Sequence, residues 1–378
     1  MKKNSGFTLV EIIIAMAVTM IAMSAAVLLF RDSTKANNSV TQNSDMSDNL
    51  RAGLNLVVQD LIQTGTGIPT GGISIPNSGG CNAVAKRVKR PPAVLALTFD
   101  GPNSSNVGCN VILPAIEPGN ALGPTVTSPD GTSGPRTDVI TIMYADNTLA
   151  LVQKPINTAA CPAGAIAPTG STITFDSSVG CVTLGAAGIP VNPGDLLMIY
   201  NANQPNGILQ TVTSVAGQTL NFAAADAFNL NGRTATETAG TIKQLQNLTG
   251  GVPNGTYPPT SATRVWMVTY YLDATTDLNH PMLMRGVNFN TPQPVAETLE
   301  NLQFAFNFAD GTTPAPVNQF AVPIVPAPTG DNENQIRSVN VYMGARSTTS
   351  AANPGKYART NLATQVALRS MAYFNTYK

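Results

Sequence analysis

The sequence predicts an α+β protein in which one long N-terminal helix packs on a large antiparallel β-rich body. The first observation is that residues 1–64 contain no proline and carry helical patterns. The second is that residues 65–378 contain short runs of alternating apolar residues separated by segments rich in Gly and Pro. The total length of 378 residues leaves ample chain for a sizeable core beyond the helix.

The helix begins with an apolar segment. From Phe7 to Phe30 every residue is apolar or small and weakly polar, except Glu11. Twenty-four residues in a helix span about 36 Å, more than the roughly 30 Å of a bilayer core. Residues 7–30 are therefore predicted to cross a membrane. A carboxylate at the centre of such a segment costs about 2.5 to 3.5 kcal/mol, and even near an end, where Glu11 lies, it is expected to have a functional partner.

An amphipathic segment, residues 31–64, continues the same helix. Its apolar residues recur at spacings of four, four, three and four, namely Met46, Leu50, Leu54, Val57 and Leu61. This stripe predicts a helix that lies on a sheet, because a coiled-coil stalk would require a longer heptad repeat. Gly53 within the stripe costs about 1 kcal/mol relative to Ala but does not end the helix. Gly65, Gly67 and Pro69 are expected to end it.

Residues 65–378 are predicted to form one β-rich body, with room for two lobes. The expected strands share alternating or continuous apolar residues: Leu95 to Phe99, Ile140 to Tyr144, Asp195 to Tyr200, Leu209 to Val215, Val265 to Leu272, Leu302 to Phe308, Val339 to Met343, and Val366 to Leu368. Long loops are expected at residues 65–80, 101–137, 155–175, 224–260 and 310–335.

Four cysteines, Cys81, Cys109, Cys161 and Cys181, all follow the apolar segment. The basic residues ahead of that segment, Lys2 and Lys3, place the N-terminus inside and the body in an oxidising space outside the cytoplasm. Two disulfides are therefore expected. Three pairings are possible, and proximity favours Cys81 with Cys109 and Cys161 with Cys181. A zinc site is not expected, because only His280 remains to assist and the spacings are wrong.

Charge and composition disfavour nucleic acid as a partner. The chain has 21 Lys and Arg against 21 Asp and Glu, so it has no net field that attracts phosphates. One local cluster, Lys86-Arg87-Val88-Lys89-Arg90, offers four cations in five residues. A solvated loop is the expected structure of this cluster, and contact with phosphate or an acidic partner is the alternative.

The sequence offers little material for catalysis. It has one histidine and lacks the nucleophile elbow, the HExxH motif, the P-loop and the C-x-x-C pair, so neither enzymatic activity nor a cofactor is expected. Oxygen ligands for calcium are available at Asp331-Asn332-Glu333-Asn334 and at Asp273 with Asp277, but both are interpreted as solvated turns. Trp266, Tyr270 and Tyr271 are interpreted as core residues of a strand, with a sugar-binding platform as the alternative.

The run Gly6-Phe7-Thr8-Leu9-Val10-Glu11, followed by the apolar segment, resembles the class III signal of type IV prepilins and pseudopilins. The resemblance implies that residues 1–6 are a leader, that a prepilin peptidase cuts between Gly6 and Phe7, and that Phe7 is then N-methylated. It also implies that Glu11 guides packing against the next subunit. The new α-amine, with a pKa of about 7.7 to 8.0, is a suitable cation for Glu11 within one chain or between two.

Two other interpretations of the N-terminus remain open. A secretory signal peptide would use Ala22-Met23-Ser24 as its cleavage site, but its apolar core is usually about 7 to 15 residues. A membrane anchor that is never cut would leave Glu11 and the junction between Gly6 and Phe7 without a purpose. We therefore favour the prepilin interpretation.

Short blocks along the chain resemble, in order, those of PilW-type minor pilins, which are similar to GspJ-type pseudopilins. The blocks are residues 48–54, 59–65, 138–145, 194–197, 270–273, 300–304 and 362–369. The resemblance implies a type IV pilin-like fold and a minor subunit, near the filament tip, that takes part in assembly of a type IV pilus. The body is larger than that of major pilins and the apolar segment lacks their usual proline, which favours a low-copy tip position.

The same resemblance implies the partners and the location. The partners are a prepilin peptidase, other minor and major pilins, and the pilus assembly machinery of the inner membrane. The precursor is expected in the inner membrane with its body in the periplasm, and the mature protein in the pilus. A GspJ-like pseudopilin of a type II secretion system and a pilus-tip adhesion module are the alternative functions.

Overall fold

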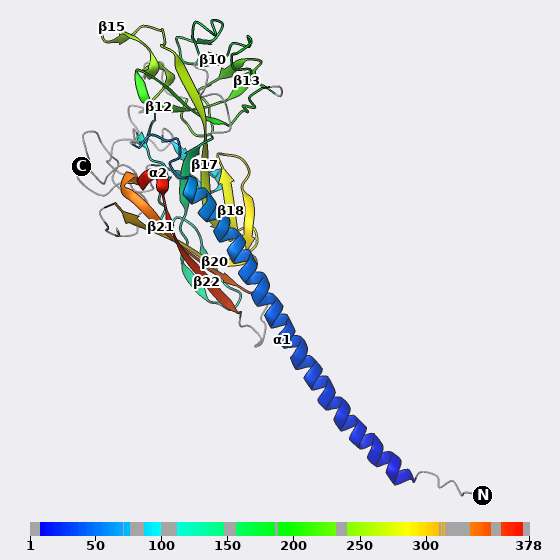
Figure 1. Cartoon of the computed structure of the whole chain (residues 1–378). Coiled ribbons are helices and arrows are strands. Elements are labelled where there is room, and N and C mark those ends of the chain that lie inside the picture. Colours follow the sequence, from blue (N-terminus) through cyan, green and yellow to red (C-terminus); the bar gives the residue numbers. More distant parts are fainter. Residues whose placement is uncertain are drawn as a thin grey trace.

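One helix, α1 (Leu9–Gln63), runs for 55 residues from the apolar segment into the body (Figure 1). The computed structural model describes residues 8–70, 72–75, 87–99, 112–146, 156–185, 188–231, 240–309, 311, 313, 333–348 and 357–372. Gly65 and Gly67 follow the helix with φ of +79° and +70°, conformations that favour glycine. The long helix followed by a large β-rich body confirms the predicted α+β, pilin-like fold.

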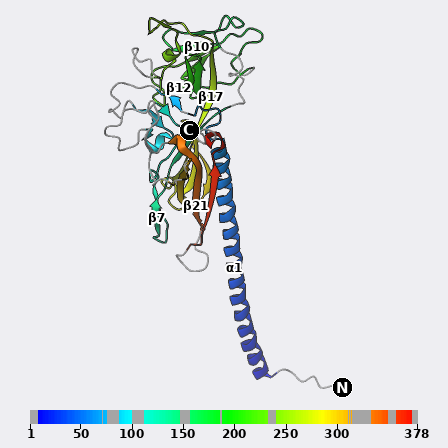
Figure 2. The same cartoon turned by 60° about the vertical axis from the view of Figure 1, so that its left-hand side comes forward.

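The two halves of α1 differ in burial. Every residue from 8 to 38 is exposed, whereas the five residues of the predicted stripe are buried. Figure 2 shows the same arrangement, with the N-terminal half of α1 extending away from the body. The amphipathic half therefore packs on the β-rich body, as the spacing of the stripe predicts.

The largest sheet has nine strands and pairs almost entirely antiparallel. The order is β19-β18-β17-β11-β12-β1-β4, and β8 joins β17 to β5. The only parallel pair that the described strands of this sheet contain is β1 with β12. The strands are β1 (Ile73–Ser74), β4 (Ile112–Leu113), β5 (Ile116–Glu117), β8 (Ile140–Ala145), β11 (Leu196–Asn201), β12 (Gln204–Thr211), β17 (Thr260–Asp273), β18 (Met282–Val287) and β19 (Gln293–Glu297).

A three-stranded antiparallel sheet packs beside α1. It contains β20 (Leu299–Phe308), β21 (Ile336–Arg346) and β22 (Arg359–Ala367), and the short helix α2 (Arg369–Ala372) follows it. The alternation predicted for β20 is confirmed, because Leu302, Phe304, Phe306 and Phe308 are all buried. The last strand is nine residues long, and Leu368 lies just beyond its end.

A second lobe lies at the end of the molecule opposite the N-terminus (Figure 1). Its four-stranded sheet has the order β13-β14-β10-β9, and it has a hydrophobic core separate from the core under α1. The elements are β9 (Ala165–Ile166), β10 (Thr172–Thr174), β13 (Ser214–Ala216), β14 (Thr219–Asn221), the 3-10 helix η4 (Ile242–Leu245), and the hairpin of β15 (Leu248–Thr249) and β16 (Val252–Pro253). We call this part the distal lobe.

Further short elements complete the body. They are β2 (Lys89–Arg90), the 3-10 helix η2 (Ala93–Leu95), β3 (Leu97–Thr98), β6 (Thr125–Thr127), β7 (Ser133–Arg136) and the 3-10 helix η5 (Glu333–Gln335). β2 pairs with β3, and β6 pairs with β7 as a hairpin.

Three expectations about strands and loops were wrong. Four of the predicted long loops contain short strands: residues 65–80 hold β1, 101–137 hold β4 to β7, 155–175 hold β9 and β10, and 224–260 hold β15 and β16. Strands of two to four residues are too short to give a visible alternation. Leu95 ends a 3-10 helix instead of entering a strand. The predicted strand Leu209 to Val215 is split, because β12 ends at Thr211 and β13 begins at Ser214.

Candidate functional site in the exposed half of α1

The N-terminus of α1 is closed by a capping box between Thr8 and Glu11. The hydroxyl of Thr8 accepts a hydrogen bond from the N–H of Glu11 at 3.4 Å. In return, the N–H and the hydroxyl of Thr8 each donate to Oε2 of Glu11 at 3.0 Å. The box thereby satisfies the N–H of the N-cap residue Thr8, while the N–H of Glu11 also donates to the carbonyl of Thr8 at 3.1 Å. Sequence reasoning missed the role of Thr8, although the pattern T-x-x-E is the signature of such a box.

Glu11 has no ion pair within the described residues of the single chain. Its carboxylate is held by hydrogen bonds from Thr8, and its side chain is exposed. Gly6 and Phe7, the residues predicted to flank the cleavage site, lie outside the described residues. A cationic partner for Glu11 must therefore be sought at the N-terminus or on another molecule.

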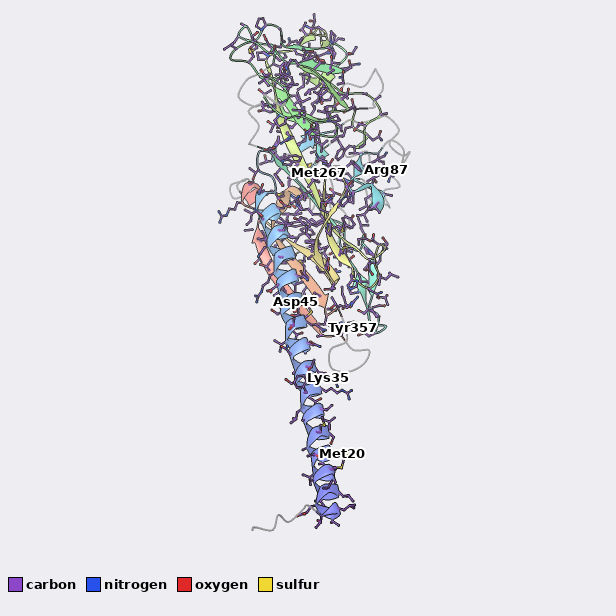
Figure 3. The ribbon with its side chains drawn as sticks, turned by 90° about the vertical axis from the view of Figure 1, so that its right-hand side faces the viewer. Met20, Lys35, Asp45, Arg87, Met267 and Tyr357 are labelled. Atoms are coloured by element: carbon purple, nitrogen blue, oxygen red, sulfur yellow. A yellow bond between two sulfur atoms is a disulfide. The ribbon has the colours of Figure 1, made fainter. Side chains whose placement is uncertain are left out.

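The helix surface next to Glu11 is apolar and uncovered. Its large apolar side chains are more than half exposed, from Leu9 at 74% to Phe30 at 78%. The helix has a mean hydropathy of 2.6 over its most apolar 18 residues, and it is long and apolar enough to span a membrane. Figure 3 shows Met20 and Lys35 on the part of α1 that lies away from the body. A surface of this kind requires lipid or other apolar helices around it.

The buried half of α1 approaches the sheets closely at Gly53. A Cβ at this position would lie 2.9 Å from the Cβ of Ala296 on β19 and 3.2 Å from a methyl group of Leu283 on β18. No side chain larger than hydrogen fits without a shift of the helix or the sheet. The glycine that weakens the helical pattern is therefore explained by close packing.

A buried carboxylate, Asp60, fixes the end of α1 to the large sheet. Arg285 Nε on β18 lies 2.7 Å from Asp60 Oδ2, and Arg285 Nη2 donates to Oδ1 at 3.2 Å. The hydroxyl of Tyr270 donates to Oδ2 at 2.6 Å and that of Tyr144 to Oδ1 at 3.3 Å. Burial and the adjacent carboxylate raise the pKa of Tyr144 to about 12 and also raise that of Tyr270. This four-residue cluster holds the exposed half of α1 in a defined direction.

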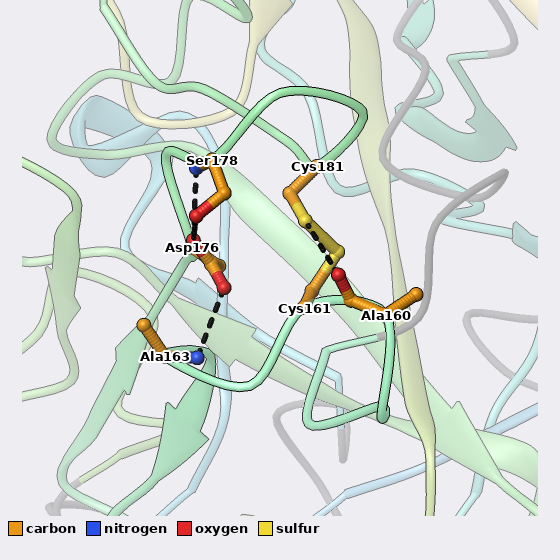
Figure 4. The surroundings of a disulfide bond; sticks show 6 residues. All are labelled: Ala160, Cys161, Ala163, Asp176, Ser178 and Cys181. Atoms are coloured by element: carbon orange, nitrogen blue, oxygen red, sulfur yellow. Dashed lines mark hydrogen bonds between the residues drawn. A yellow bond between two sulfur atoms is a disulfide. The ribbon is translucent and has the colours of Figure 1, made fainter.

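Cys161 and Cys181 form a disulfide in the distal lobe (Figure 4). Their Cα atoms are 5.8 Å apart, and this is the pairing that sequence proximity favours. Asp176 orders the loop between them, because it accepts from the N–H groups of Ala163 and Ser178 at 2.9 and 2.8 Å. The hydroxyl of Ser178 also donates to Oδ1 of Asp176, and this bond, followed by those from the two N–H groups, lowers the pKa of Asp176. Cys81 and Cys109 lie outside the described residues.

The basic cluster is not a solvated loop. Lys86 lies outside the described residues, Lys89 is exposed, and Val88 and Arg90 are buried. Arg90 donates to Thr141 Oγ1 and to the carbonyl of Pro118, each at 2.7 Å, and to the carbonyl of Glu117 at 2.9 Å. Its guanidinium is therefore used inside the body, which corrects the expectation of a solvated loop.

The aromatic residues near β17 belong to the fold. Tyr270 and Tyr271 are buried, and Trp266 is half-buried with the guanidinium of Arg264 stacked 4.3 Å from its ring centroid. The interpretation as core residues of a strand is confirmed for the two tyrosines.

Of the acidic candidates for calcium, Asp273 and Asp277 hold local turns through their side chains, but Glu333 is buried in the 3-10 helix η5, which corrects the expectation of a solvated turn at that position. Asp273 accepts from Thr275 and Thr276, and Asp277 accepts from Asn279 and His280. Asp331 and Asn332 lie outside the described residues. Among the residues that are described, there is no group of three or more His, Cys, Asp and Glu side chains that suits a metal ion.

Comparison with known protein families gives a match to the prokaryotic N-terminal methylation motif over residues 1–27. Comparisons with curated proteins and with solved structures give no match. The matched segment contains Gly6, Phe7 and Glu11 and the first part of the exposed helix. The chain thus carries the N-terminus of a prepilin-type precursor, of the pilin or pseudopilin kind, with an apolar helix suited to anchoring it in the inner membrane.

Proposed function

We propose that the chain is a minor subunit of a type IV pilus, placed near the filament tip. In this proposal a prepilin peptidase cuts between Gly6 and Phe7, and Phe7 is N-methylated. The exposed half of α1 then leaves the inner membrane and packs among the helices of other pilins. The protein acts by assembly and not by catalysis.

The observation that carries the proposal is the exposed apolar half of α1 with Glu11 at its far end. This half stands free of the body, as the part of a subunit that enters a bundle of helices must do. The capping box presents the carboxylate of Glu11 at the first turn without a cation from the described residues. An N-terminal amine of this or a neighbouring subunit would form a charge-assisted hydrogen bond with it.

The size and direction of the body support a position near the tip. The distal lobe lies beyond the C-terminal end of α1, on the opposite side of the molecule from the membrane-spanning half (Figure 1). A subunit above this one in a shaft would have to share that space. A low-copy subunit at the tip has no subunit above it, so its distal lobe does not overlap with a neighbour. A pseudopilin of a type II secretion system would use the same helix and a glutamate in the same position. The proteins that co-purify with this chain therefore distinguish a pilus subunit from a pseudopilin.

The first test is the mass of the N-terminal peptide, with and without active prepilin peptidase. A peptide that begins at N-methylated Phe7 only when the peptidase is active is the expected result. A peptide that begins at Met1 in both samples would overturn the processing step.

The second test separates the charge of Glu11 from its role in the capping box. Glu11→Gln keeps an amide oxygen that serves in the box but removes the charge, and Glu11→Ala removes both. We expect both variants to insert in the membrane and to fail to enter filaments. Thr8→Val, which loses the cap but keeps the charge, is the matched control and should still assemble. Normal assembly of Glu11→Gln would refute the proposed ion pair.

A further inference from the structure

The outer face of the β20–β21–β22 sheet carries a small hollow, lined by both polar and apolar groups, whose floor is a glycine. Registers place Asn301 opposite Gly344 and Gly344 opposite Asn361, so these three residues form one row across the three strands. Because Gly344 has no side chain, the row is open between the two carboxamides. Tyr342, two residues along β21, lies on the same face. The resulting cavity has a volume of about 260 Å³.

The hollow faces away from α1. Met343, the residue between Tyr342 and Gly344, is buried and lies next to Gly53 of α1. Successive side chains of a strand point to opposite faces, so Tyr342 points away from the helix. The hairpin of β6 and β7 walls one side of the cavity through Val126 and Thr132. In any assembly with α1 at its centre, this hollow would open outward.

The charges around the hollow cancel. Arg359 Nε lies 2.9 Å from Glu300 Oε2, and Arg359 Nη2 lies 2.9 Å from Asp130 Oδ2. The buried Arg346 approaches Glu300 Oε1 at 3.0 Å. Two cations therefore meet two anions, and the network fixes Arg359 and Glu300 in place. Such a lining offers no net attraction to a phosphate or to an organic cation.

Among the described residues, the uncharged part of the lining retains unused hydrogen-bonding capacity. Asn361 Nδ2 donates to the hydroxyl of Tyr342 at 3.2 Å, and Asn301 Oδ1 accepts from Gln303 at 3.0 Å. A carboxamide has two donors and two acceptor positions, so each asparagine uses only one of four in these bonds. Tyr342 adds an aromatic ring with a polar tip. Thr132 and Thr360 contribute hydroxyls.

We propose that this hollow binds a neutral saccharide. Amide and hydroxyl groups pair with sugar hydroxyls, and the C–H face of a sugar ring packs on an aromatic ring such as that of Tyr342. The volume lies just below the roughly 300 to 1,000 Å³ of common ligand pockets, which suits one sugar ring at the end of a longer chain. The site is separate from α1, so the proposal does not depend on the assembly role of Glu11.

The test uses the full chain in a zwitterionic detergent without a sugar head group. The probes are glucose, galactose, mannose and N-acetylglucosamine with their β-linked disaccharides, and binding is followed by saturation-transfer NMR. Glucuronate and sialic acid serve as charged comparators. We expect at least one neutral probe to bind, and we expect neither charged comparator to displace it.

Two variants locate the binding. Gly344→Val fills the floor of the hollow, and its nearest neighbour, the Cβ of Asn301, would lie 3.4 Å from the new Cβ, an ordinary contact. Tyr342→Ala removes the ring. Each should weaken binding at least roughly tenfold, whereas Ala305→Val, on the same face outside the cavity, should leave it unchanged. The proposal is overturned if no neutral probe binds up to about 50 mM, if only charged probes bind, or if Gly344→Val, with an unchanged melting temperature, binds as the wild type does.

Discussion

Asp60 of α1 and Arg285 of β18 form an ion pair with Nε and Oδ2 2.7 Å apart, and this pair fixes the helix to the sheet. The carboxylate is almost fully buried, at 5% exposure, while Arg285 keeps 25%. The hydroxyls of Tyr270 and Tyr144 complete the shell of the carboxylate. A carboxylate taken out of water at this depth is tolerated because each of its oxygens accepts hydrogen bonds.

Replacement of Asp60 is expected to loosen the helix from the body. Asp60→Ala would leave Arg285 and two hydroxyls without their acceptor, and we expect a loss of about 3 kcal/mol in the free energy of unfolding. Urea unfolding of the full chain in detergent measures it. Asp48→Ala, on an exposed position of the same helix, is the control and should change stability by less than about 0.5 kcal/mol. Equal stability of the two variants would contradict the anchoring role.

The same cluster predicts a loss of stability at high pH. A tyrosine in the unfolded chain ionises near pH 10, but Tyr144 in the folded protein keeps its proton up to about pH 12, and the pKa of Tyr270 is also raised. Between these values the unfolded state binds fewer protons than the native state, so the free energy of unfolding falls as pH rises. The contribution of Tyr144 to the free energy of unfolding is fully present below about pH 10 and is lost toward pH 12. Urea midpoints at intervals across this range measure the slope, and Tyr144→Phe should make it shallower. An unchanged slope in that variant would exclude Tyr144 as a source of the pH dependence of stability.

At Gly53, helix propensity and packing are expected to change stability in opposite directions. Gly53→Ala improves helix propensity by about 1 kcal/mol. The added methyl, however, would lie 2.9 Å from the Cβ of Ala296 and force the helix outward. We expect a net destabilisation of about 1 to 2 kcal/mol, by the same unfolding measurement. Asn49→Ala, at an exposed position of α1, should instead be neutral or slightly stabilising. A stabilised Gly53→Ala would show that the sheet yields at this contact.

The disulfide of the distal lobe should act locally. Cys161 and Cys181 are separated by 20 residues, and a loop of that length corresponds to about 3 kcal/mol of stabilisation. In Cys161→Ser/Cys181→Ser, amide hydrogen exchange should become faster in β9, β10, β13 and β14. Exchange in α1 from Met46 to Leu61 is the internal control and should not change, because this segment packs in the other core. Faster exchange in α1 alone would contradict the division into two cores.

Local patterns in the sequence were sufficient to predict the helix and the strands beside it. The stripe from Met46 to Leu61 and the alternation of β20 each arise from neighbours on one face of one element, so short windows contain the signal. The same holds for the missed capping box of Thr8 and Glu11, which four residues encode.

Features that join distant parts of the chain were not predictable in this way. Asp60 is part of an ordinary helical sequence, and its partners lie 84 to 225 residues further on. The hollow at Gly344 arises from a register between three strands, and a glycine within a strand is equally typical of a bulge or a tight bend. Pairing of this kind becomes visible only when the strands are placed.

Arg90 shows both the use and the limit of local patterns. Its sequence neighbours indicate a charged surface, whereas its contacts lie inside the body. Burial lowers its pKa to about 10, so it remains charged at neutral pH, and its guanidinium donates to a threonine and to several carbonyls at once. Arg90→Lys keeps the charge but has no planar fork to reach these acceptors, and we expect a loss of about 2 kcal/mol or more. Lys89→Ala, at the exposed neighbouring position, should leave the urea midpoint unchanged. If Arg90→Lys were as stable as wild type, charge alone would suffice at this site and the fork geometry would be unnecessary.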